Sequence, residues 1–121
     1  MIDMEVPVIS ALENGLLDSV GNKVFRWFVP KENSNDYPYI RVAELDNTDE
    51  DYRDNKAVAS DIAIQVDLWT KGDPDILQNR IDQIMKTLQF KRIGVSSFYE
   101  ENSGAMRKAL RYTSKVNLKE E

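Results

Sequence analysis

The stretch SDIAIQVDLWT, residues 60–70, decides the fold that we expect for this chain. Apolar side chains occupy every second position within it, at Ile62, Ile64, Val66 and Leu68. Side chains alternate between the two faces of a strand, so this pattern predicts a strand with one face against a hydrophobic core. Trp69 falls on the opposite face, where it needs cover from the connection that follows or from a protein interface.

Two stretches with helical spacing lie on either side of this strand in the sequence. Residues 7–20 carry apolar side chains on one helical face, with Pro7 in the first turn and Gly21 after the end. Residues 74–89 follow Asp73, a favourable N-cap. Their apolar side chains repeat at intervals of three and four: Leu77, Ile81, Ile84, Met85 and Leu88. Both stretches predict helices that pack one face against a sheet.

The rest of the chain predicts further strands and one long loop. The strands are expected at residues 24–29, 39–45, 90–99, with a bend near Gly94, and 105–118. The acidic stretch at residues 46–56 has no hydrophobic period, and we expect a long exposed loop there. The order α-β-β-β-α-β-β predicts a single α+β domain over residues 1–121, a mainly antiparallel sheet with two helices packed on one face.

Composition excludes most catalytic chemistry. The 121 residues include no Cys and no His, so disulfides, Cys/His zinc sites and histidine-based triads are absent. We therefore predict no enzyme activity and no cofactor. No basic leader followed by an apolar segment and no long apolar run occurs, which predicts a soluble, non-secreted protein. The net charge of −5 argues against a protein whose main task is to grip phosphates.

The acidic side chains lack the spacing of a metal site. A calcium loop that begins at Asp46 would need a glutamate where Ala57 stands. A magnesium nuclease site would need neighbouring carboxylates, yet Asp61 and Asp67 lie about 20 Å apart along an extended strand. We therefore predict no metal site, and we expect both aspartates to face basic residues across the sheet.

Basic residues concentrate in the last predicted strand. Two tyrosines, Tyr99 and Tyr112, lie near these basic residues, which are Arg107, Lys108, Arg111 and Lys115. This combination is found in proteins that bind single-stranded nucleic acid, but alternate basic residues also protect an exposed edge strand or form subunit contacts. The acidic net charge favours the second interpretation. The candidates for a subunit interface are Trp69, Arg107, Arg111 and Lys115.

The chain from Tyr37 onward resembles a known family. The sequence YPYI at residues 37–40 opens a strand before the acidic stretch, and IAIQVDLW at residues 62–69 leads through a short turn into the helix at residues 76–88. This arrangement resembles the tail terminator, or tail completion, proteins that join head and tail in long-tailed bacteriophages and prophages. An amphipathic helix of the right size precedes it, so the resemblance covers most of the chain.

The resemblance implies a structural subunit of the virion tail, assembled in the host cytoplasm. Such subunits form a ring, often of six copies, that caps the tail tube and contacts the head connector or neck proteins. DNA would pass through the ring without specific binding, and no membrane is involved. The residues expected to face the channel are Asp46, Asp49, Glu50, Asp51 and Asp54. Two alternatives stay open: a small intracellular α+β binding or regulatory module, acting as a dimer, and a neck or head-tail connector subunit.

Overall fold

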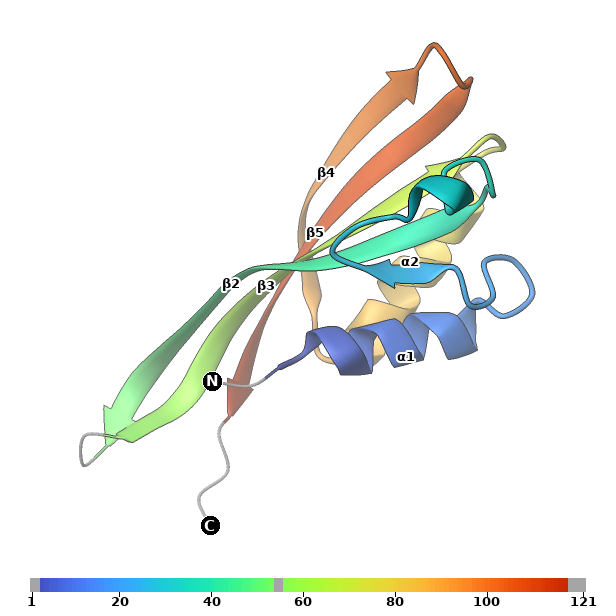
Figure 1. Ribbon diagram of the computed structural model, residues 1–121. Helices are drawn as coiled ribbons and strands as arrows, with labels where there is room; N and C mark the ends of the chain where they lie inside the picture. Colours follow the sequence, from blue (N-terminus) through green and yellow to red (C-terminus); the bar gives the residue numbers. More distant parts are fainter. Residues whose placement is uncertain (1–2, 54–55, 118–121) are drawn as a thin grey trace.

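The structure, a computed structural model, describes residues 3–53 and 56–117, and it confirms the α+β class (Figure 1). A five-stranded sheet has the order β1-β2-β3-β5-β4. β1 runs parallel to β2, and the remaining neighbours are antiparallel. The elements are α1 (Glu5–Gly15), β1 (Val24–Arg26), the 3-10 helix η1 (Lys31–Asn33), β2 (Tyr39–Arg53), β3 (Lys56–Thr70), α2 (Asp75–Thr87), β4 (Lys91–Glu100) and β5 (Ala105–Asn117).

The hydrophobic core lies between the sheet and both helices, which cover the same face (Figure 1). β3 contributes the four alternating side chains that its sequence predicts, and each of them is fully buried. α1 and α2 meet them with Val8, Leu12, Ile81 and Met85. The core face of β3 is therefore the predicted one.

Both helices are shorter than predicted. α1 begins at Glu5 rather than Pro7 and ends at Gly15, five residues before the predicted end. The two helices lie very close at Gly15, because a Cβ there would stand 2.5 Å from the Cδ1 atom of Ile84 in α2. Arg80 of α2 donates to the Gly15 carbonyl at 2.8 Å and to the Asp18 carboxylate at 2.7 Å. The hydrogen bond from Arg80 to the Asp18 carboxylate is the main reason that the pKa of Asp18 lies below its usual value.

The described part of the acidic stretch, residues 46–53 and 56, is strand rather than the predicted loop. The backbone of β2 continues to Arg53 and pairs with β3 in a long hairpin, through partners such as Glu50 with Ala59 and Arg53 with Lys56. Main-chain pairing does not require an apolar side chain at every second position, so alternation could not reveal these strand residues. Asp54 lies outside the described residues, and for Asp46, Asp49, Glu50 and Asp51 only the backbone is described.

The strand order rules out one interpretation of the basic residues in the last strand, protection of a sheet edge. β5 lies between β3 and β4, and β4 forms the edge. A register shift between Arg92 and Gly94 confirms the predicted bend. At the other edge, β1 ends at Arg26, because Trp27 adopts a φ of 73°. Trp27 is 59% exposed, and the strand is three residues shorter than the predicted residues 24–29.

Replacing Leu68 tests the core face of β3. Leu68→Ala should lower the free energy of unfolding by about 2–5 kcal/mol, because the core around it cannot close the cavity completely. The matched control Leu17→Ala removes a side chain that is 69% exposed and should change stability by less than about 0.5 kcal/mol. Urea denaturation monitored by circular dichroism measures both, and equal losses would contradict the assignment.

Candidate functional site

A buried carboxylate organises the face of the sheet that the helices leave open. Asp67 of β3 is fully buried although it points away from the hydrophobic core. Its Oδ2 accepts from the guanidinium of Arg41 in β2 at 2.6 Å, and its Oδ1 accepts from Arg107 in β5 at 3.0 Å. Gln65 donates to both oxygens. The predicted contact between Asp67 and a basic residue of the last strand is therefore confirmed.

An aromatic stack lies beside this charged cluster. The Trp69 ring stacks on Tyr39, with ring centroids 5.2 Å apart, and Tyr39 stacks on Tyr37 at 5.3 Å. The guanidinium groups of Arg41 and Arg107 lie 5.4 and 5.2 Å from the centroid of the Trp69 ring. Trp69 is only 9% exposed, and three side chains of the neighbouring strands cover it: Tyr39 and Arg41 of β2 and Arg107 of β5.

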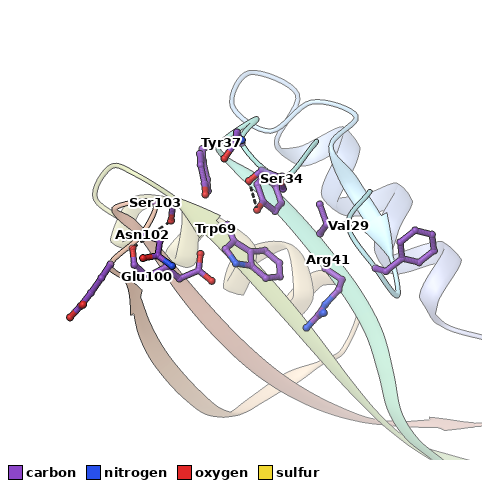
Figure 2. A pocket seen from close by; sticks show the side chains of 12 residues that line it. Val29, Ser34, Tyr37, Arg41, Trp69, Glu100, Asn102 and Ser103 are labelled. Atoms are coloured by element: carbon purple, nitrogen blue, oxygen red, sulfur yellow. Dashed lines mark hydrogen bonds between the residues drawn. The ribbon is translucent and has the colours of Figure 1, made fainter. Parts of the chain in front are cut away.

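The aromatic stack, together with Arg41, lines an open groove of about 860 Å³. Figure 2 shows Trp69 at its centre, with Glu100, Asn102 and Ser103 on one side and Val29 and Arg41 on the other. The Tyr39 hydroxyl donates to the Ser34 carbonyl at 3.0 Å. Burial raises the pKa of Tyr39 to about 12, with smaller contributions from Tyr37 and Glu100. The groove therefore offers aromatic surface with a carboxylate rim, which suits stacking and hydrogen bonding to a segment of another chain.

The predicted interface residues separate into two groups. Trp69 and Arg107 belong to the internal cluster around Asp67, so they hold the sheet together and do not stand free on the surface. Arg111 and Lys115 are exposed on β5. Arg111 donates to Gln65 at 3.2 Å, and Lys115 lies opposite Asp61 in the register of β3 and β5. The four residues therefore do not form one exposed patch.

A second buried carboxylate was not predicted from the sequence. Glu5, the first residue of α1, is almost completely buried. It accepts from Arg26 at 2.8 Å, from the Trp27 indole at 3.0 Å and from the backbone amide of Glu44 at 2.8 Å. These bonds join α1 to the ends of β1 and to β2. No pattern in the sequence marks this contact, because its partners lie 21 to 39 residues away.

Large apolar side chains are exposed at both edges of the sheet. Trp27 and Phe28, directly after β1, are 59% and 67% exposed, and Leu45 of β2 is exposed as well. On β4 the exposed apolar side chains are Ile93, Val95, Phe98 and Tyr99. Exposed apolar patches of this kind mark protein contacts. The sequence could not identify them, because the order of the strands decides which residues lie at an edge.

Comparisons with known proteins do not extend these observations. No protein-family model matches the chain, and no curated protein is significantly similar in sequence. Within residues 3–53 and 56–117, no three or more acidic side chains gather as they would around a metal ion. The helices of the same part of the chain are too short or too polar to cross a membrane.

Charge reversal at Arg107 tests the internal cluster. Arg107→Glu should lower the free energy of unfolding by an amount near the lower end of about 3–5 kcal/mol, because Asp67 stays buried and keeps Arg41 as its remaining cationic partner. The matched control Arg111→Glu alters an exposed side chain of the same strand, so its effect should stay within about 1 kcal/mol. Thermal and urea denaturation measure both variants. Equal stability of the two proteins would show that the buried carboxylate does not depend on Arg107.

Alkaline unfolding tests the buried tyrosines. The Tyr112 hydroxyl donates to Asp82 at 2.6 Å, and burial, followed by this hydrogen bond, raises the pKa of Tyr112 far above its usual value. Because the pKa of Tyr112 is higher in the folded than in the unfolded protein, this residue stabilises the folded state fully below about pH 10. Above that pH the tyrosine of the unfolded chain ionises, and the free energy of unfolding falls by up to about 1.4 kcal/mol per pH unit. Between pH 10 and 12 the stability of Tyr112→Phe should therefore fall less steeply than that of the wild type. Identical slopes in urea titrations would contradict this assignment.

Proposed function

We propose that this chain is a structural subunit of a phage or prophage tail, a tail terminator that assembles into a ring at the end of the tail tube. The observation that carries the proposal is the exposure of large apolar side chains at both edges of one sheet. The resemblance of residues 37–69 and of the following helix to tail terminator proteins supplies the class of assembly. Apolar edges on a small domain suit a protein whose work is association.

The two edges are chemically different, which favours a head-to-tail contact. One edge presents Trp27 and Phe28 beside the short β1, and the other presents the long β4. A contact between unlike surfaces repeats from copy to copy, and it closes into a ring when the rotation fits. Six copies are the number that the family resemblance favours.

The charge of the chain agrees with a passage for DNA. A net charge of −5 on each copy repels phosphates, so a ring would let the genome pass without gripping it. In this proposal the ring meets the tail tube on one side and the head connector or neck proteins on the other. It belongs to the virion and catalyses no reaction.

The groove above Trp69 favours a second candidate function, a small binding or regulatory module. A concave surface with aromatic rings and a few polar groups is typical of sites that hold a ligand or a peptide. A neck or connector subunit is a third candidate, because it would need the same kind of edges. Its position in the virion distinguishes it from a terminator.

Loss of the gene tests the proposal directly. Deleting it from the phage or prophage that carries it should give tails of uncontrolled length that do not join heads, because nothing stops polymerisation of the tube. Electron microscopy of the particles measures both effects. Tails of normal length joined to heads would overturn the proposal.

Complementation identifies the surface. Phe28→Ser should fail to restore tail length while the purified variant stays folded, because it removes an exposed apolar side chain at the β1 edge. Leu17→Ser is the matched control, since Leu17 is about equally exposed but lies in the turn after α1, outside the strands. Restoration by Phe28→Ser would exclude the β1 edge from the contact.

A further inference from the structure

β4 is a sheet edge without the usual protection against pairing. It lies at the end of the strand order, so only β5 bonds to it, and one row of its backbone groups faces outward. Residues 93–99, IGVSSFY, contain no charged side chain and no proline. The bulge at Ile93 lies near the start of the strand, and residues 94–100 pair regularly with β5. Edges of this kind accept a strand from another chain.

The opposite edge is protected by its charges and by its short outer strand. Beyond β1, residues 45–53 of β2 form the edge, and they contain Asp46, Asp49, Glu50, Asp51 and Arg53. β1 has three residues, and beyond it the amide of Glu44 in β2 is already bonded to Glu5. β4 has ten residues and is exposed along nearly its whole length. A strand that adds to this sheet through main-chain hydrogen bonds therefore finds a long edge without charged side chains at residues 93–99 of β4.

The charges of β4 stand only at its ends and have opposite signs. Lys91 and Arg92 open the strand, and Glu100 and Glu101 close it. In an antiparallel pair of identical strands, the basic start of one strand lies beside the acidic end of the other. A parallel pair would place like charges together, which destabilises a sheet. The order of charges therefore selects antiparallel pairing of β4 with itself.

We propose that β4 pairs with β4 of a second copy of this chain, around a two-fold axis at Ser96. Gly94 then lies opposite Phe98, so that an aromatic ring covers a glycine, and Val95 lies opposite Ser97. With the bulge at Ile93 included, Lys91 lies opposite Glu100 on the same face. The five strands of each copy join into one continuous sheet. This dimer stands on the sequence and exposure of β4 and does not depend on the proposed ring.

The dimer has a consequence for assembly. The proposed ring needs the β4 edge of every copy, so a copy in the dimer cannot also be part of the ring. The two-fold dimer is then the form in which the free protein covers its apolar edge strand, and it must open before a ring forms.

Charge reversal with rescue tests the pairing. The purified wild type should be a dimer in sedimentation equilibrium, and Lys91→Glu or Glu100→Lys alone should weaken it about tenfold, because each places like charges opposite one another twice per dimer. The double variant Lys91→Glu/Glu100→Lys should restore the wild-type dimer. Within one copy the two positions lie about 30 Å apart along the strand, so the rescue cannot arise inside a monomer.

Cysteine cross-linking locates the axis, because the natural chain has no cysteine. Ser96→Cys should form a disulfide between copies, since residues directly opposite in an antiparallel pair have Cα atoms about 5 Å apart. In the matched control Glu101→Cys, residue 101 of one copy lies far from residue 101 of the other, so this variant should stay monomeric on non-reducing gels. A monomeric wild type, a dimer insensitive to the reversals, or cross-linking at residue 101 instead of 96 would each overturn the proposal. A purified hexamer that shows neither the charge rescue nor the cross-link at residue 96 would overturn the dimer and leave the proposed ring standing. Tails of normal length in a phage that lacks the gene would overturn only the ring.

Discussion

The salt bridges of Asp67 with Arg41 and Arg107 are the interaction on which the open face of the sheet depends. A carboxylate that is fully buried costs several kcal/mol unless its oxygens are paired, and here guanidinium groups from both neighbouring strands pair with them. Because Arg41 and Arg107 also lie against Trp69, the same two side chains hold β2 and β5 onto β3 and cover its largest aromatic ring. Residues 66–70 of β3 are therefore buried on both faces, by apolar packing on one and by paired charges and the Trp69 contacts on the other.

The same principle joins distant segments elsewhere in the chain. Glu5 connects α1 to β1 and β2. Asp18 accepts a hydrogen bond from Arg80 of α2, and Asp82 accepts hydrogen bonds from both Arg92 and Tyr112. Each acidic group accepts donors from another element, so these ion pairs set how the helices sit on the sheet.

The two edges explain why one small domain suits assembly. The β1 edge is short and closed by Glu5, with two aromatic rings beside it, and the β4 edge is long and open. Different edges favour a head-to-tail ring, whereas the antiparallel charge order of β4 favours a two-fold pair. If both proposed contacts form, they compete for one strand, and the pairing of free copies would keep them out of the proposed ring until a tail tube orders them.

The sequence by itself determined the core. Alternation in residues 60–70 and helical spacing in residues 74–89 identified the buried face of β3 and the packing face of α2, because burial repeats with the period of each element. It also paired Asp67 with a basic side chain of the last strand. It could not show that the acidic residues 46–53 continue a strand, since backbone pairing leaves no periodic signal. Only the tertiary structure decided the strand order, and with it that Trp69 and Arg107 lie inside while Phe98 and Tyr99 lie at an edge, because neighbours in a sheet come from distant parts of the chain.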